Sequence, residues 1–163
     1  HRGGRRAAMI NANDTGGTAM YLSTNKAPLH LWIVGAVTLL WNAVGAFDYV
    51  AMQLRIGPYM SRFTPEQLEY FDGFPAWTVA AWALGVWGSL LGSLFLLLRK
   101  RWAVWLFGIA IAGLAVTTLH NFVLTDGAAV MGSGAAVFSA VIWAIALFLF
   151  FYARAMAKRG VLR

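Results

Sequence analysis

Residues 31–54 read LWIVGAVTLLWNAVGAFDYVAMQL, an apolar run long enough to cross a membrane as one helix. About 20 apolar residues, at roughly 1.5 Å of rise per residue, span a hydrocarbon core of roughly 30 Å. Two polar side chains, Asn42 and Asp48, interrupt this run. Asp48 is the only charged residue inside any hydrophobic segment of the chain. The stretch therefore predicts a transmembrane helix that carries polar groups at membrane depth.

Three further apolar runs follow, so the predicted spans lie at about 29–54, 75–98, 102–124 and 128–153. Across the 163 residues, 60% are hydrophobic and only 12% are charged, which is outside the range of soluble globular domains. We expect an all-α membrane protein, a four-helix bundle with up-down-up-down topology. The absence of Cys excludes disulfides, thiolate catalysis and Cys-based metal sites.

The domain organisation that follows has one membrane domain and two polar ends. Residues 1–28 have no periodic apolar pattern and are expected to be disordered. Met9 and Met20 are both plausible start residues. Residues 1–19 are expected to be dispensable, because they have neither an apolar face to bury nor enough hydrophobicity to repay the entropy of ordering. The transmembrane domain is assigned to residues 29–154, and residues 155–163 are expected to form a basic cytoplasmic tail.

The loop between the first two spans contains a helix-start signal. Thr64 can cap a helix, Pro65 suits its first position, and Gln67 completes a capping box. We therefore expect a short interfacial helix at about residues 65–71. Its acidic residues could bind a cation or a polar solute, or could simply form a solvated surface; they are Glu66, Glu69 and Asp72.

Small residues recur at four-residue spacing in two spans, which is typical of faces where membrane helices pack closely. In span two they are Ala81, Gly85, Ser89 and Ser93, beside Gly88 and Gly92. In span four they are Ala128, Gly132, Ala136, Ala140 and Ala144. Gly45 lies on the same helical face as Asp48 and should likewise admit a neighbouring helix.

The distribution of basic residues predicts the orientation in the membrane. The N-terminal tail, the turn at 99–101 and the C-terminal tail hold 11 Lys and Arg residues, whereas the other two loops hold only Arg55 and Arg62. Because cytoplasmic loops retain basic residues, both termini are expected in the cytoplasm. The same charges, placed at the ends of spans, do not predict nucleic-acid binding.

Four polar residues at membrane depth form the candidate site: Asp48, His120, Asn121 and Asn42. On the predicted topology Asp48 and His120 lie at similar depths near the exported ends of two parallel spans, so they could share a hydrogen bond or a proton, with Asn121 beside them. This pair could form a solute or proton site, or a structural contact between helices. For Asn42 we expect a structural interhelical hydrogen bond.

Catalytic and cofactor functions are not predicted. His30 and His120 lie near opposite membrane faces and cannot flank one haem within a chain. No HExxH, P-loop, GxGxxG or GxSxG pattern occurs. We therefore expect no enzyme activity, no cofactor and no metal.

Four stretches carry a resemblance to a known group of proteins: LWNAVGAFDYVAMQ at 40–53, FTPEQLEYFDGFPAW at 63–77, GVWGSLLGSLFLLLRKRWAV at 85–104 and YARAMAKRGVLR at 152–163. Over about residues 27–163 the chain resembles a family of small four-span proteobacterial inner-membrane proteins of uncharacterised function, some of them labelled putative sugar transporter. The resemblance implies the four-span fold and no particular site residues.

Two functions remain open from the sequence. The first is a small-solute transporter or membrane-embedded solute binder; transport through four spans would require a homodimer, because many transporters are built from paired repeats. The second is a non-catalytic accessory or assembly subunit of a larger membrane complex. A polar cavity reaching Asp48 and His120 would favour the first function, and a sealed bundle with a lipid-facing stripe of small residues would favour the second.

Overall fold

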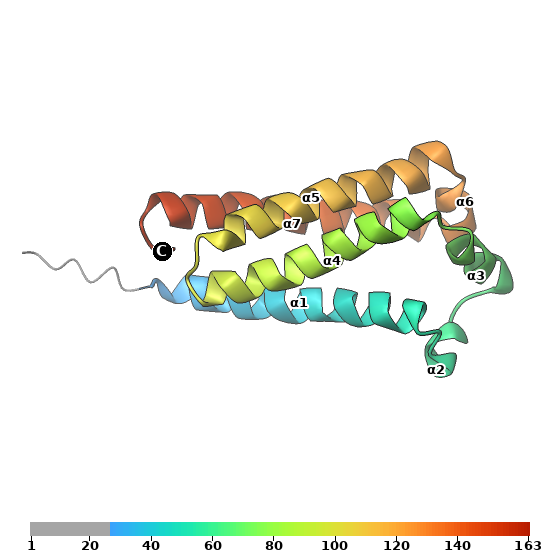
Figure 1. The fold of residues 1–163 in the computed structure, drawn as a ribbon, viewed down its shortest axis with the longest axis horizontal. Coiled ribbons are helices and arrows are strands. Elements are labelled where there is room, and N and C mark those ends of the chain that lie inside the picture. Colours follow the sequence, from blue (N-terminus) through green and yellow to red (C-terminus); the bar gives the residue numbers. More distant parts are fainter. Residues whose placement is uncertain (1–26) are drawn as a thin grey trace, which may run out of the picture.

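The computed structural model describes residues 27–163, which form helices and connecting turns without a strand (Figure 1). The four long helices are α1 (Leu29–Gln53), α4 (Ala76–Leu97), α5 (Trp102–Leu119) and α7 (Gly134–Lys158). Three short α-helices and one π-helix connect them, namely α2 (Gly57–Met60), α3 (Pro65–Asp72), η1 (His120–Leu124) and α6 (Gly127–Met131). The expected four-helix bundle is confirmed. Residues 1–26 lie outside the described part, and so do the predictions made for residues 1–19 and for nearly all of 1–28.

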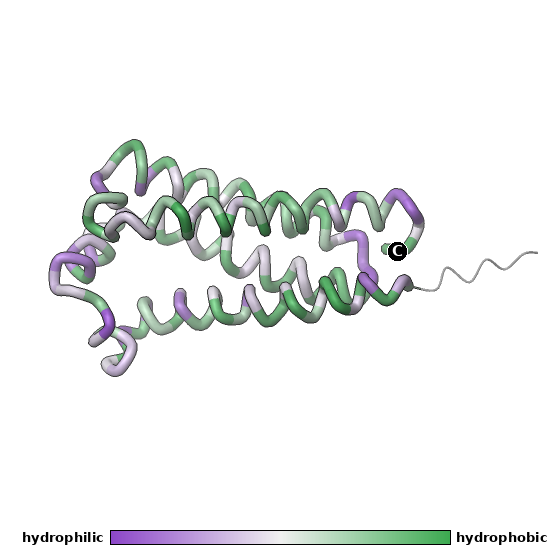
Figure 2. Tube along the Cα trace, turned by 180° about the vertical axis from the view of Figure 1, so that it is seen from behind, coloured by the Kyte–Doolittle hydropathy of each residue, from purple (hydrophilic) through white to green (hydrophobic). Residues whose placement is uncertain are grey.

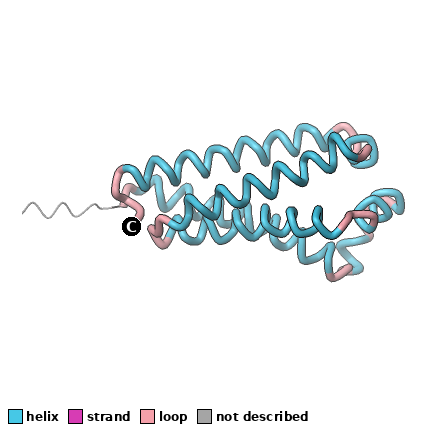
Figure 3. The backbone as a smooth tube through the Cα atoms, turned by 45° about the horizontal axis from the view of Figure 1, so that its top comes forward, coloured by secondary structure: helices cyan, strands magenta, loops and turns pink. Residues whose placement is uncertain are grey.

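Four helical segments are long and apolar enough to cross a membrane; the third runs through the π-helix, from Trp102 to Leu124. Hydrophilic residues gather at the two ends of the bundle, and the loops lie at these ends (Figures 2 and 3). One end carries the turn at 99–101 and the end of α7, and we call it the basic end. The other carries α2, α3 and α6 (Figure 1), and we call it the acidic end. This distribution is typical of an integral membrane protein.

Helix α4 packs against both α1 and α5. Helix α7 packs against α5 and also meets α1, where His30 Nδ1 and the Tyr152 hydroxyl lie 2.5 Å apart. Small residues explain the close approach of α4 to α5. A Cβ atom placed on Gly113 would lie 2.5 Å from the carbonyl oxygen of Ala81 and 2.7 Å from the backbone nitrogen of Gly85. The two backbones are therefore in direct contact, and the small-residue face predicted in span two is confirmed.

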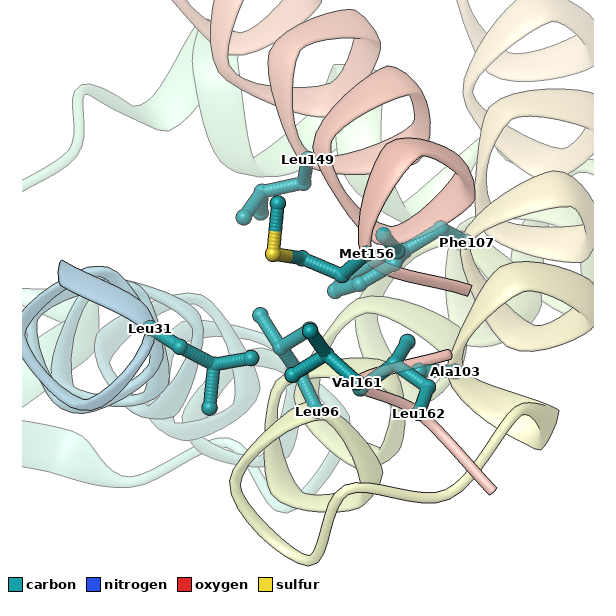
Figure 4. Packing of buried hydrophobic residues seen from close by; sticks show 9 residues of the cluster. Leu31, Leu96, Ala103, Phe107, Leu149, Met156, Val161 and Leu162 are labelled. Carbon is teal, nitrogen blue, oxygen red and sulfur yellow. The ribbon is translucent and has the colours of Figure 1, made fainter. Parts of the chain in front are cut away.

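The hydrophobic core is concentrated at the basic end, where all four long helices contribute side chains (Figure 4). Leu31 from α1, Phe107 from α5 and Met156 from α7 are almost completely buried there. Val161 and Leu162 also lie in this core, beyond the end of α7. The backbone N–H of Arg163 donates to the carbonyl of Arg99 at 2.7 Å, so the last residues fold back over the bundle.

The predicted boundaries of the fourth span differ from the observed ones. The helix was expected from residue 128, but α6 ends at Met131 and Gly132 adopts a φ of +84°, a conformation that glycine adopts readily. Helix α7 then begins at Gly134 and continues to Lys158, into the segment expected as a tail. A break of this kind is set by backbone conformation at one glycine, which hydropathy does not reveal.

Four of the predicted close-packing positions admit no neighbouring helix within residues 27–163. Ala136, Ala140 and Ala144 are exposed on α7, because this helix meets α5 through larger side chains, such as Trp143, whose indole N–H donates to Thr118 Oγ1 at 3.0 Å. A Cβ atom on Gly45 would meet nothing within 4 Å. The expectation that these small residues admit a neighbouring helix is therefore wrong within one chain.

Candidate functional site

The acidic end is built on the interfacial helix α3, which begins as the sequence predicts. The Thr64 hydroxyl accepts a hydrogen bond from the Gln67 backbone N–H, and the Gln67 side chain accepts one from the Thr64 N–H, at 3.3 Å and 3.2 Å. This capping box fixes the start of α3. Aromatic contacts then hold the helix in place. The Phe71 ring lies 6.2 Å from that of Trp82, in α4, and the Tyr70 ring lies 5.2 Å from that of Phe74, in the turn between α3 and α4.

Asp48 and His120 do not form the predicted pair. Asp48 Oδ1 accepts a hydrogen bond from the hydroxyl of Tyr59, in α2. Within residues 27–163 no hydrogen bond joins Asp48 to His120, because α1 packs on α4, which lies between α1 and α5. The partner of this half-buried carboxylate comes from the loop that follows its own helix.

His120 lies at the last turn of the third span and is 5% exposed. Its Nδ1 is 3.2 Å from the Asn121 Oδ1, so the predicted neighbour Asn121 is beside it. Aromatic rings surround the imidazole, with the ring centroids of Phe74 at 4.9 Å and Trp77 at 5.4 Å. If Nδ1 carries the proton and donates to the amide oxygen, Nε2 is the acceptor nitrogen of the neutral ring.

A hydrogen-bonded network extends from His120 to α3. The Tyr70 hydroxyl donates to Asn121 Oδ1 at 2.9 Å and lies 2.8 Å from Thr125 Oγ1. Thr125 Oγ1 donates to the backbone carbonyl of His120 at 2.7 Å. Three elements, α3, η1 and the turn after η1, are therefore joined around this side chain.

The backbone at His120 is unusual, because residues 120–124 form one turn of π-helix. π-Helical turns are rare and are frequently found at functional sites. The hydrogen bond from Thr125 to the carbonyl of His120 satisfies an acceptor at the end of the helix. The turn places His120 and Asn121 toward α3 and is not signalled by the hydrophobic pattern of the span.

A shallow depression of about 350 Å³, largely open to solvent, lies at the acidic end beside His120. This depression, which we call the solute cavity, is lined by Glu66, Glu69, Tyr70, Gly73, His120, Thr125, Asp126 and Val130. Three of these residues are acidic and none is Lys or Arg. Hydrogen bonds from its own backbone N–H, and next from the Thr64 hydroxyl, lower the pKa of the Glu66 carboxyl, so this residue stays ionised in mildly acidic conditions.

Asn42 has the structural role that was predicted for it. Its side-chain amide donates to Ser93 Oγ at 2.9 Å and to the backbone carbonyl of Ser89 at 3.2 Å. Ser93 is fully buried and its hydroxyl lies 3.5 Å from Thr38 Oγ1. These bonds join α1 to α4 at membrane depth, as interhelical hydrogen bonds of amide side chains commonly do.

Two residues of the site were missed in the sequence. No role in the site was predicted for Tyr59 or Tyr70, yet each hydroxyl is hydrogen-bonded to a polar residue of a span. A buried Tyr hydroxyl usually finds a partner, so the coincidence of interfacial Tyr residues with polar residues near span ends was an available signal.

No group of three or more His, Asp or Glu side chains within residues 27–163 is arranged to hold a metal ion. In comparisons with known proteins, no family model, curated protein or solved structure matches the chain.

Proposed function

We propose that this membrane protein binds a small, positively charged solute at its acidic end, in the solute cavity beside His120. The observation that carries the proposal is the cavity itself, which combines a buried imidazole on a π-helical turn with three carboxylates. Its volume of about 350 Å³ falls within the range of small-molecule sites, roughly 300–1,000 Å³.

The chemistry of the lining favours a cation over an anion. Glu66, Glu69 and Asp126 provide negative charge, and the hydroxyls of Tyr70 and Thr125 provide further oxygen atoms. An amine could donate hydrogen bonds to these oxygen atoms and to the acceptor nitrogen of His120. The function would be non-catalytic, since binding of this kind requires no reacting group.

Transport is the further step that this proposal allows. The cavity reaches His120 but not Asp48, so it opens at one end of the bundle. A homodimer in the bacterial inner membrane, with both termini in the cytoplasm, would provide the second half of a pathway. The chain resembles a proteobacterial family in which some members are labelled putative sugar transporter. Neutral sugars are therefore included among the solutes to be tested.

The test is a thermal-stability screen of the purified protein in nanodiscs against small amines, amino acids and neutral sugars. We expect a primary amine to raise the unfolding temperature of the native protein, and Glu69→Gln and His120→Gln to abolish that rise. Asp72→Asn is the matched control, because Asp72 lies on the same helix but does not line this cavity. Stabilisation by sugars alone, or an equal loss in the control, would contradict a cation site.

A second function, an accessory subunit of a membrane complex, is favoured by the exposed small residues of α7. Ala136, Ala140 and Ala144 are exposed on α7 and would admit a helix of a partner protein. Ala140→Leu should then remove one defined membrane protein from an affinity purification, whereas Val137→Leu, a change at a larger exposed residue of α7, should retain it. An unchanged set of co-purifying proteins would count against this role.

A further inference from the structure

A second cavity, of about 370 Å³, lies at the acidic end on the other side of α3. Residues from the end of α1, from α2, from α3 and from the beginning of α4 form its wall, and none of them lines the solute cavity. We call it the interfacial cavity, because it lies where the first span leaves the membrane. The two cavities can therefore be altered independently.

The wall of the interfacial cavity combines apolar and charged residues. Met52, Met60, Leu68, Phe71 and Trp82 provide the apolar part. Methionine side chains adapt their shape readily, and a Trp ring at this depth is typical of the membrane interface. Such a wall can accommodate part of an acyl chain.

The charged part is an ion pair between the Arg55 guanidinium and Asp72 Oδ1, both of which line the cavity. Their side chains are 67% and 52% exposed, so each can exchange its partner for a ligand. A surface ion pair of this kind contributes little to stability, about 0–1 kcal/mol. The pair thus presents one positive and one negative group in the wall of this cavity.

The backbone at Arg55 adopts a helix-ending conformation. Arg55 follows the C-cap of α1 with a φ of +50°, in the left-handed region common just after a helix end. Arg99 has the same conformation after α4, with a φ of +57°, so this backbone geometry ends both helices. At Arg55 it places the residue in the wall of the cavity.

From this arrangement we infer that the interfacial cavity binds a zwitterionic phospholipid with a primary ammonium group, of the phosphatidylethanolamine class. The phosphate would accept two hydrogen bonds from the guanidinium of Arg55, and the ammonium group would donate to Asp72. The phosphate would replace Asp72 as the partner of Arg55, and the ammonium group would replace Arg55 as the partner of Asp72. An acyl chain would lie against Met52 and Met60.

The same chemistry discriminates against other common phospholipids. Phosphatidylglycerol has no cation for Asp72, so its binding leaves that carboxylate beside an anionic headgroup. Phosphatidylcholine is a zwitterion, but its quaternary nitrogen has no N–H to donate to a carboxylate. The expected order of retention therefore places phosphatidylethanolamine first.

Native mass spectrometry of the protein, extracted from vesicles with equal amounts of the three lipids, tests the inference. We expect the native protein to retain phosphatidylethanolamine roughly fivefold more than either of the others, the ratio that about 1 kcal/mol produces. Arg55→Gln and Asp72→Asn should remove this preference. Arg62→Gln is the matched control, because Arg62 is in the same loop, over the Tyr59 ring, and does not line the cavity.

Val79→Trp provides a variant that keeps both charges and fills the cavity from α4. It should reduce the retention of all three lipids, and it still tests the site if Arg55→Gln does not fold. Equal retention of the three lipids by the native protein, or an equal loss of preference in Arg62→Gln, would overturn the inference. Glu69→Gln should leave lipid retention unchanged, so failure of the solute site and failure of this lipid site can be distinguished.

Discussion

The hydroxyl of Tyr59 donates a hydrogen bond to Asp48. Asp48 is the acidic residue inside the first span, and Tyr59 lies in the short helix α2 that follows this span. A carboxylate at membrane depth requires a polar partner, because an unpaired one is costly there. The loop after α1 folds back to provide that partner. Asp48 therefore helps to fix the position of α2 and makes no hydrogen bond to a neighbouring span within residues 27–163.

Tyr59→Phe removes this donor and leaves the half-buried carboxylate without its hydrogen bond. We expect the free energy of unfolding to fall by about 1–3 kcal/mol, the usual cost of an unsatisfied buried group. Thermal unfolding in detergent measures the change. Tyr49→Phe is the control, because the Tyr49 hydroxyl makes no hydrogen bond within residues 27–163 and its ring packs on Trp82. An equal loss in both variants would show that the bond contributes nothing.

The separation of Asp48 from His120 makes a second prediction. Asp48→Asn and His120→Gln should change the unfolding free energy additively, within about 0.3–0.5 kcal/mol, because the two side chains share no partner. Asp48→Asn and Tyr59→Phe, in contrast, should be coupled. A double-mutant cycle by thermal unfolding measures both. Coupling between Asp48 and His120 would contradict this separation and would support the direct contact predicted from the sequence.

Asn42 offers a test of the bond between α1 and α4. Asn42→Ala should lower the unfolding free energy by about 0.6–2 kcal/mol, as measured for interhelical hydrogen bonds in membranes. Ser93→Ala should cause part of the same loss, because Ser93 Oγ is one of the two acceptors. Ser89→Ala is the matched control, since Ser89 accepts through its backbone carbonyl, which alanine retains. A loss in Ser89→Ala as large as in Asn42→Ala would contradict this account.

The fold could be predicted from the sequence where hydropathy, capping and small-residue spacing act locally. The four spans, the Thr64 capping box and the glycine contacts of α4 all follow from residues a few positions apart. The partners of Asp48 and His120 could not be predicted from the sequence, because the depth of a residue along a span does not reveal which helices are adjacent. Asn121 was predicted beside His120 because adjacency in sequence was enough, whereas Tyr59 and Tyr70 required the loop to fold back.

The distribution of Lys and Arg predicts the orientation in the membrane, and the arrangement of the helices is compatible with that orientation. Residue 27 and the end of α7 lie at the same end of the bundle (Figure 1), as expected for two pairs of antiparallel spans. We expect both termini in the cytoplasm. Alkaline phosphatase fused after Arg163 should therefore be inactive, and the same enzyme inserted near Arg62 should be active. The reverse pattern would require the opposite orientation.

The closest backbone contact between α4 and α5 provides the most selective test of the packing. Gly113→Ala would place a Cβ atom 2.5 Å from the Ala81 carbonyl oxygen, and since both neighbours at this point are backbone atoms, the helices would have to separate. We expect a loss of about 1–3 kcal/mol in the free energy of unfolding, the usual cost of overpacking, measured by thermal unfolding in detergent.

Gly108→Ala is the matched control, because it makes the same chemical change on the same helix. There the nearest atom to a new Cβ is Phe150 Cε2 at 3.7 Å, an ordinary contact distance. Alanine is also the better helix former by about 0.5–1 kcal/mol, so this variant should be as stable as the native protein or more stable. Because helix propensity favours both substitutions equally, a difference in sign between them isolates the contact with α4. Two variants of equal stability would mean that α4 and α5 are not in backbone contact at Gly113.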